Sequence, residues 1–434
     1  MKPLERPLEQ GCIRAALADG ECCAVVGVSN SGKSTLLRSV QPTDPQTLLF
    51  YVDCNRMLEL SEQGFYEAVL RAVRSGLREQ EAPPDLAGQL EEDYHQVVEP
   101  RTPFSVPMGF SDALERLCEN RRRVVLILDE FDEPFEALEG RTFLNLRALR
   151  DRYRKGLVYV TGTSRTLEEI RDDPQTVEFR EMFVGRVCLV GMLSAEATSA
   201  LIQALAADAD AVLTAEEAAF VARAAGGHPG LLGAVVWLLL HARALAPQTY
   251  QRMGVRLVAA ALAGDAAVRG ECEKLWEPLT VAERRALLTR ASGAQTTPAE
   301  TERLQGKGLL TAGGKVFGEV FADFVRRRSE RRSDLPAGVW LDEDAGEVYV
   351  DGRQAPTLTD LEYRLLHALY ERRDKLCDKY LLVEKVWGES YIDQVDDARI
   401  EKLVSRVRAK IEDDPANPRI LVTVRGRGYQ LKCW

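Results

Sequence analysis

One stretch of the sequence, Gly27-Val28-Ser29-Asn30-Ser31-Gly32-Lys33-Ser34, fits the pattern G-x-x-x-x-G-K-[ST]. The apolar run Cys22–Val28 leads into it and predicts a buried strand, and a helix is expected over Ser34–Ser39. Glycines in such a loop let backbone N–H groups turn inward around phosphate oxygens. The start of the following helix also favours an anion. We therefore expect this loop to bind the phosphates of a nucleoside triphosphate.

Individual side chains of the loop have distinct expected roles. Lys33 can reach the β- and γ-phosphates, and Ser34 can ligate Mg²⁺. A chance match in a turn rich in glycine and serine is the alternative, but the strand and helix on either side favour the phosphate site. The residues expected to bind the nucleotide here are Gly27, Asn30, Ser31, Gly32, Lys33, Ser34 and Thr35.

Four more short apolar runs predict buried strands, and polar turns or helical segments follow most of them. This alternation is typical of an α/β domain with a parallel sheet. The predicted strands are Leu48–Val52, Val124–Leu128, Leu157–Val160 and Val187–Val190. The acidic, proline-containing stretch Glu79–Pro107 interrupts the pattern, so we expect a surface insertion there.

Polar residues follow two of these strands, at the edge where α/β proteins place their ligands. Asp129 is expected to hold Mg²⁺, through water, and Glu130 to orient and polarise the attacking water. Arg165 comes after the next strand and could sense the γ-phosphate. The alternatives are an acidic helix cap for the two acids and a surface loop position for Arg165.

The turn Gly226-Gly227-His228-Pro229-Gly230 lies between two helical runs. Its glycines can end one helix and Pro229 can start the next. A second role is to pack His228 and Pro229 against the nucleotide base, and the composition alone does not separate the two.

These motifs, in this order, resemble the STAND class of P-loop ATPases, in its archaeal-type and bacterial branches. The block Leu275–Arg328 is similar to the winged helix that closes the STAND nucleotide module. The resemblance implies a core over residues 1–192, a helical lid over 193–265 and the closing winged helix over 266–332. It also implies an ATP/ADP switch that ADP holds closed and ATP opens, often with self-association.

The last part of the chain, residues 338–434, predicts a separate small domain. A hairpin is expected over Val339–Val350. A helix follows with Thr359 as its N-cap and Glu362 in capping-box position, and a second helix lies near Lys379–Val386. A third helix, Asp397–Ile411, has an apolar stripe made of Ile400, Leu403, Val404, Val407 and Ile411. Two strands then surround a glycine-containing turn.

This domain resembles the OmpR/PhoB-type winged helix-turn-helix of response regulators, on Leu358-Thr359, Val386-Trp387-Gly388, Ser405-Arg406-Val407-Arg408 and Thr423–Tyr429. In that family the third helix enters the major groove of DNA and an arginine of the wing reaches the minor groove. The residues that the resemblance assigns to DNA binding, or that lie beside them on the helix and the wing, are Arg399, Lys402, Arg406, Lys410, Arg425 and Arg427.

Charge limits the kinds of partner. The whole chain has a net charge of −10, which argues against a nucleic-acid-coated protein or a membrane-surface protein. Residues 338–434 are net −3, yet residues 398–411 and 419–432 are each net +4. Basic reading elements on an acidic domain still suit DNA, and a protein-docking winged helix is the alternative.

Nine scattered cysteines without a C-x-x-C pair, no apolar leader after Met1, and no apolar run of membrane length predict a soluble cytoplasmic protein with reduced thiols. The sequence predicts an α/β P-loop NTPase core with a helical lid and a winged helix, followed by an α+β winged helix-turn-helix domain. The function favoured is a slow ATPase that works as a switch for a DNA-binding transcription regulator. The alternatives are a sensor ATPase of a bacterial defence system and, less favoured, an origin-binding AAA+ initiator.

Overall fold

The structure, a computed structural model, describes residues 6–42, 44, 46–79, 84–119, 123–333, 338–343, 346–350, 353–356, 358–388, 397–424 and 426–432. They fall into two compact units. The first consists of Met1–Pro278 with Thr301–Asp323, and the second of Leu279–Glu300 with Phe324–Trp434. Residues 266–332, which the sequence predicts as one closing winged helix, are thus divided between the two units. The predicted domain boundaries remain predictions.

A parallel sheet of five strands forms the centre of the first unit, in the order β2-β3-β4-β1-β5. The strands are β1 (Cys23–Val26), β2 (Thr47–Asp53), β3 (Arg123–Asp129), β4 (Leu157–Thr163) and β5 (Val187–Leu189). All five predicted strands are therefore present. The sheet edge at which β1, β3 and β4 end carries the predicted phosphate loop and the acids, because the carboxyl ends of parallel strands meet at one edge.

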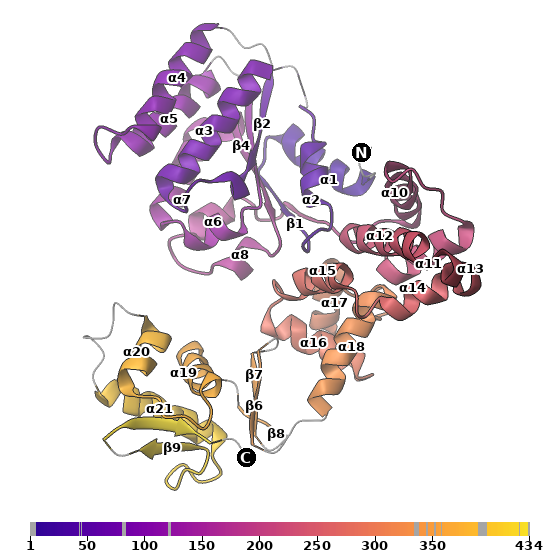
Figure 1. The fold of residues 1–434 in the computed structure, drawn as a ribbon. Helices are drawn as coiled ribbons and strands as arrows, with labels where there is room; N and C mark the ends of the chain where they lie inside the picture. Colours follow the sequence, from indigo (N-terminus) through magenta and orange to yellow (C-terminus); the bar gives the residue numbers. More distant parts are fainter. Residues whose placement is uncertain are drawn as a thin grey trace. The chain divides into compact units, whose positions relative to one another are not determined.

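Helices cover both faces of this sheet (Figure 1). On one face, α1 (Pro7–Asp19) and α2 (Lys33–Arg38) bury Ile13 and Leu36 against β1, β3 and β4. On the other face, Phe65, Phe110 and Phe143 belong to a larger apolar cluster. The helices that contribute to that cluster are α3 (Glu62–Glu79), α4 (Pro84–Val98), α5 (Ser105–Cys118), α6 (Asp132–Ala137), α7 (Gly140–Tyr153), α8 (Leu167–Ile170) and α9 (Val177–Glu181).

The expected surface insertion over Glu79–Pro107 was wrong for the part that the structure describes. Helix α4 buries Leu90 and Val97 in the same cluster as α3 and α5. The carboxylate of Asp93, which is 1% exposed, pairs with Arg116 Nε of α5 at 2.9 Å. Among the described prolines, Pro84 begins this helix, Pro100 and Pro103 lie between it and α5, and Pro107 lies in the first turn of α5, so none interrupts a helix interior.

A group of helices follows β5, over the residues that the sequence predicts as a helical lid, and we refer to them as the lid. They are α10 (Ala195–Asp208), α11 (Ala215–Ala225), α12 (Pro229–Leu245), α13 (Pro247–Met253) and α14 (Val255–Ala261). Helices α15 (Ala266–Trp276) and α17 (Pro298–Gly306) follow, and the expected hairpin near Leu310–Phe317 reduces to one bridge, Leu310 with Val316. Helix α18 (Glu319–Ser333) then leads from the first unit into the second.

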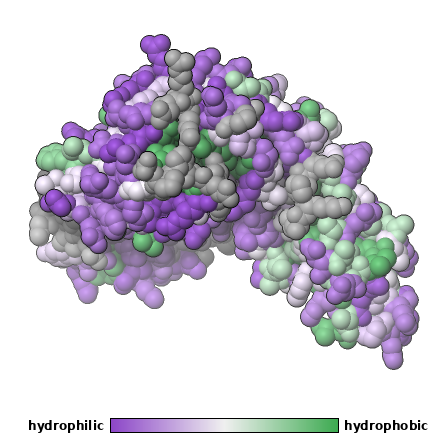
Figure 2. All heavy atoms as spheres, turned by 90° about the horizontal axis from the view of Figure 1, so that it is seen from above, coloured by the Kyte–Doolittle hydropathy of each residue, from purple (hydrophilic) through white to green (hydrophobic). Residues whose placement is uncertain are grey.

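No single helix in the described ranges is both long and apolar enough to cross a membrane, although α12 and α13, which meet at 116°, pass that test as a bent pair. On the face seen in Figure 2, hydrophilic side chains predominate and apolar ones gather in small groups.

The second unit contains α16 (Val281–Ala291) and the C-terminal domain. A three-stranded antiparallel sheet, β6 (Val339–Asp342), β7 (Glu347–Val350) and β8 (Arg353–Gln354), precedes three helices and a hairpin. These are α19 (Asp360–Glu371), α20 (Lys379–Trp387), α21 (Asp397–Ile411), β9 (Leu421–Val424) and β10 (Gly428–Leu431). The predicted stripe of α21 is buried in one core with α19 and α20, and the capping box of Thr359 and Glu362 is formed.

Candidate functional site

The loop after β1 has a backbone that its sequence allows. Asn30 and Gly32 have positive φ angles of 54° and 93°, a conformation that suits asparagine and glycine. At Gly27 a Cβ atom would lie 2.8 Å from both Cβ and O of Val190. Only glycine therefore lets the chain pass Val190 closely and curve back toward α2.

Lys33 is buried beneath this loop at 5% exposure. Its Nζ donates to the carbonyl oxygens of Gly27 at 2.8 Å and Val28 at 3.3 Å. Burial lowers the pKa of this ammonium, while the carboxylates of Glu130, Asp132 and Asp129 oppose that shift. A phosphate oxygen would give this buried cation a nearby opposite charge, which the neutral carbonyls do not provide, and such an attraction is strong in a buried site.

Ser31 supplies a second sign that the loop fits a phosphate group. Its Oγ is buried and has no hydrogen-bond partner among the described residues. Leaving a buried hydroxyl unsatisfied costs roughly 1–3 kcal/mol. A phosphate oxygen held in the loop would relieve that cost and would also accept from Lys33.

The two predicted acids lie where β3 ends. Asp129 is 1% exposed, and its carboxylate accepts from the hydroxyl of Tyr51 and from the N–H of Glu130 at 3.0 Å. Glu130 adopts φ 53°, a strained conformation for glutamate that active sites often retain. Burial raises the pKa of the Glu130 carboxyl, and Lys33 opposes the shift.

Two neighbours of Asp129 were not found from the sequence. Tyr51 lies on β2 and pairs with Ile127 in the sheet register, so its contact with Asp129 depends on strand pairing. Gly162 on β4 leaves space for the carboxylate, since a Cβ there would lie 2.7 Å from Asp129 Oδ1. Neither residue belongs to a local motif.

Arg165 is near this edge but is not among the residues that line the cavity at the loop. Its guanidinium lies 3.9 Å from Glu136 Oε2, and its Nε is buried without a partner among the described residues. The adjacent Ser164 is bound by Asp132, whose carboxylate accepts from Ser164 Oγ at 2.5 Å and from its N–H at 2.9 Å. The γ-phosphate role of Arg165 stays a prediction.

A cavity of about 270 Å³ lies against the loop and brings most of the predicted site residues together. Its lining comes from the loop and α2, from the end of β3, and from the lid. The residues are Asn30, Gly32, Lys33, Ser34, Thr35, Glu130, Leu201, Leu205, Pro229 and Gly230. Pro229 thus lies beside the loop, and its contact with a nucleotide base stays a prediction. Leu201 and Leu205 of α10 form an apolar wall that the sequence did not reveal.

His228 is fully buried and connects the lid to the loop. It is the N-cap of α12: its Nδ1 accepts from the N–H of Leu231 at 3.1 Å, and its ring lies 6.1 Å from that of Phe317. Because Nδ1 is an acceptor, Nε2 carries the proton and donates to the carbonyl of Ser29 at 2.8 Å. Both ring nitrogens are therefore used within the protein. The expected contact of His228 with a base stays a prediction, and these bonds leave it no free polar atom.

Asn30 makes a second connection of this kind. Its Nδ2 donates to Glu271 Oε2 of α15 at 2.8 Å. Gly230 permits the close approach, because a Cβ there would lie 2.1 Å from the same Glu271 oxygen. The loop is thus hydrogen-bonded to two helices outside the core.

The buried His228 predicts a specific pH dependence. Burial lowers its pKa to about 4, below the value of an unfolded histidine. Because the unfolded chain binds the proton more tightly, stability is lost as pH falls from about 6.5 to 4 and changes no further below that. The loss attributable to this group is about 3 kcal/mol.

In His228→Asn, which can still cap α12, the free energy of unfolding should fall less over this range. Urea titrations from pH 7.5 to 4 test this, and parallel curves for the two proteins would contradict it.

The predicted DNA-reading residues are placed mainly on one helix. Arg399, Lys402 and Arg406 of α21 are exposed, and Arg399 lies 5.8 Å from the ring of Trp387. Arg427 is exposed between β9 and β10, whereas Arg425 lies outside the described residues.

Two other basic residues of α21 are committed to the fold. Lys410 Nζ pairs with Glu362 Oε2 of the α19 capping box at 2.5 Å, so this residue helps to join α19 to α21. Arg408 donates to the carbonyl of Leu421 and to Thr423 Oγ1, each at 2.8 Å. The DNA-binding prediction for Lys410 is therefore the least favoured of the set.

Comparison with known proteins divides the chain in the same way. Residues 17–170 match a protein-family model described as an AAA domain, and residues 353–431 match one described as "Transcriptional regulatory protein, C terminal". The DNA-binding response regulator MtrA of Mycolicibacterium smegmatis is 39% identical over 112 residues, which are 24% of this chain and 48% of that protein. The chain thus spans about half the length of the curated relatives it matches.

Two solved structures are similar in parts. The Walker-type ATPase PABY2304 of Pyrococcus abyssi is 16% identical, covers 74% of this chain and 96% of its own, and superposes with a TM-score of 0.47. The RstA DNA-binding domain of Klebsiella pneumoniae, solved with the RstA box, is 24% identical, covers 23% and 95%, and gives a TM-score of 0.20. From the family matches and the sheet topology, the chain has an AAA-type P-loop domain and a C-terminal domain of the OmpR/PhoB type. The predicted fold class is confirmed.

Proposed function

We propose that this chain is an ATP-dependent switch of the STAND class that controls DNA binding by its C-terminal domain and so regulates transcription. The observation that carries the proposal is the cavity in which the phosphate loop, Glu130 and the lid residues meet. A nucleotide bound there contacts core and lid together, so its γ-phosphate can change how the lid is held. A turnover slow enough for a switch is part of this proposal.

The chemistry assigned to the site follows from its residues. Lys33 and the loop N–H groups would hold the phosphates, while Ser34 and Asp129 would hold Mg²⁺, which would supply positive charge against the phosphates. Glu130 orients the attacking water, and Arg165 contacts the γ-phosphate. Among the described residues there is no group of three or more His, Cys, Asp or Glu that could hold a metal ion. The donor set fits a magnesium that arrives with the nucleotide, since Mg²⁺ usually uses one or two protein ligands and substrate phosphates.

Contacts along the chain support a link between the nucleotide and the C-terminal domain. Glu271 of α15 accepts from Asn30 in the loop, and the next helix, α16, places Arg285 Nε 2.6 Å from Glu347 Oε1. Glu347 is 4% exposed on β7 and also accepts from Tyr349 Oη at 2.6 Å. Consecutive helices thus contact the nucleotide loop and, within the second unit, the sheet of the DNA-binding domain.

DNA is the partner that the C-terminal domain supports best. Three basic residues, Arg399, Lys402 and Arg406, are exposed on α21, and helices of this kind read base edges in the major groove. Self-association on ATP binding belongs to the proposal, and a sizing measurement in ADP and in ATP tests it. A docking role for the winged helix remains the competing function if DNA binding is absent.

Arg406→Ala should weaken DNA binding. If Arg406 contacts a base edge, the loss is about 1–3 kcal/mol on the specific site, with relaxed preference at one position. The measurement is a titration of the full-length protein, in ADP and in ATP, against the DNA upstream of its own coding sequence. Arg364→Ala, on the exposed side of α19 in the same domain, is the matched control. Affinity that is equal in the two nucleotide states would contradict the switch, and no DNA binding in either state would favour the docking function.

A further inference from the structure

A cavity of about 480 Å³ lies beside β2, which is the edge strand of the sheet. The side of β2 over residues 49–53 forms one wall, and α3 forms the other. The residues of α3 that face it include Ala68, Ala72 and Gly76, whose small size leaves the space open. The volume is that of an ordinary small-molecule pocket.

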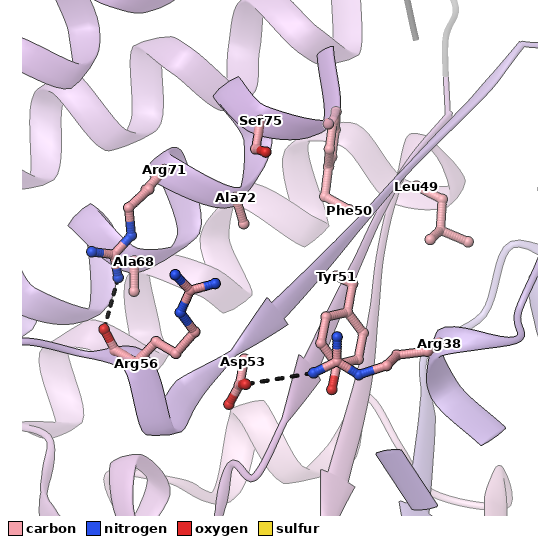
Figure 3. Close-up of a pocket in the computed structure, with 11 residues that line it drawn as sticks. Arg38, Leu49, Phe50, Tyr51, Asp53, Arg56, Ala68, Arg71, Ala72 and Ser75 are labelled. Carbon is pink, nitrogen blue, oxygen red and sulfur yellow. Dashed lines mark hydrogen bonds and ion pairs between the residues drawn. The ribbon is translucent and has the colours of Figure 1, made fainter. Parts of the chain in front are cut away.

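Three arginines from three different elements line this cavity (Figure 3). Arg38 comes from the end of α2; its guanidinium lies 4.1 Å from the centre of the Tyr51 ring and 3.5 Å from Asp53 Oδ2. Arg71 of α3 donates to the carbonyl of Arg56 at 2.7 Å and lies 3.5 Å from Glu67.

Arg56 differs from the other two. Figure 3 shows its side chain extended into the space between α3 and β2, and its guanidinium has no hydrogen bond or ion pair with any described residue. Arg38 is paired with Asp53 and Arg71 with Glu67, whereas no described carboxylate pairs with Arg56. A planar guanidinium of this kind suits phosphate or carboxylate oxygens.

The cavity is connected to the nucleotide site by a hydrogen bond. Tyr51, whose ring lies under Arg38, donates its hydroxyl to the carboxylate of Asp129. Burial, together with this bond, raises the pKa of Tyr51, so the hydroxyl keeps its proton at neutral pH. In this arrangement the Tyr51 hydroxyl is bonded to a carboxylate oxygen of Asp129, the residue that we assign to Mg²⁺. A ligand that draws Arg38 away from Tyr51 would loosen that bond.

We propose that this cavity is a second ligand site that takes a small dianion, the head of a phosphate ester or of a dicarboxylate, through Arg56 and Arg38. Bound anion competes with Asp53 for Arg38 and releases Tyr51 from Asp129. The freed carboxylate is then available to magnesium, so the anion and MgATP favour each other. The site itself is independent of the proposed function, and only this coupling rests on it.

Calorimetric titration at low ionic strength tests the site, with inorganic phosphate and succinate as probes. The protein is first saturated with MgADP, so that the phosphate loop is already filled. One of the probes should bind, and Arg56→Ala should weaken that binding at least about tenfold, because the lost guanidinium is the anion's direct partner. Arg14→Ala, an exposed arginine on α1, is the matched control and should bind normally. Phosphate binding alone identifies a phosphorylated ligand, and succinate binding alone identifies a carboxylate.

Three results would overturn the site: no heat with either probe, equal losses in the two variants, or binding seen only without nucleotide. The coupling has its own readout, the affinity for MgATP with and without the probe. Linkage requires the effect to be reciprocal, and Arg56→Ala should remove it. Unchanged MgATP affinity alongside normal anion binding would overturn the coupling and leave the site. Failure of the proposed function appears separately, as absence of nucleotide binding in the wild type.

Discussion

Lys33→Ala is expected to abolish ATP binding. Its Nζ is the buried cation beneath the loop, bonded to the carbonyls of Gly27 and Val28. Removing one partner of a buried, hydrogen-bonded charge pair costs roughly 2–5 kcal/mol in complexes. Each 1.4 kcal/mol is a tenfold change in affinity. The measurement is equilibrium binding of labelled ATP in the presence of Mg²⁺.

A control variant and a thermal melt distinguish the loss of the phosphate contact from damage to the fold. Lys315→Ala removes an exposed lysine that belongs to none of the motifs and should bind ATP normally. A thermal melt of Lys33→Ala without nucleotide should stay close to that of the wild type, because the two carbonyls it leaves can be hydrated. Unchanged ATP affinity in a folded Lys33→Ala protein would remove the site assignment.

The sequence predicted the core because its signals are local. The loop Gly27–Ser34 carries its own glycines and lysine, and each strand is an apolar run long enough to recognise. The capping box of Thr359 and Glu362 and the stripe of α21 likewise depend on residues that are close together in the sequence. Patterns that repeat over a few residues are visible in the sequence alone, so the elements and their order could be predicted.

What the sequence could not show depends on pairing between distant segments. Tyr51 reaches Asp129 only because β2 lies beside β3, and Gly162 makes room only because β4 is the next strand. Helix α4 was mistaken for an insertion because its buried residues are few among many acids, and tertiary packing outweighs that composition. The sequence alone did not show that Lys410 forms an ion pair with Glu362, because the two residues lie on different helices.

Glu130→Gln is expected to retain ATP but to slow its hydrolysis. Glutamine preserves the size of the side chain and removes the charge that polarises the attacking water. Asp129 and Ser34 stay in place to hold Mg²⁺, so binding should change little. General-base and water-orienting groups contribute typically about 10²–10⁴-fold to a rate, and a loss in that range is the expected result in single-turnover hydrolysis.

The environment of Glu130 gives this prediction a second readout. Burial raises the pKa of its carboxyl, so the ionised form is lost at a higher pH than for an ordinary glutamate. Wild-type turnover should therefore fall as pH is lowered through that raised pKa, and the residual rate of Glu130→Gln should lack this step. Glu133→Gln, an exposed acid on α6, is the matched control and should keep both the rate and the pH profile. Hydrolysis by Glu130→Gln at the wild-type rate would mean that another group positions the water. The hydrolysis on which the switch depends would then have to rely on Arg165 or on a residue supplied by a second copy of the chain.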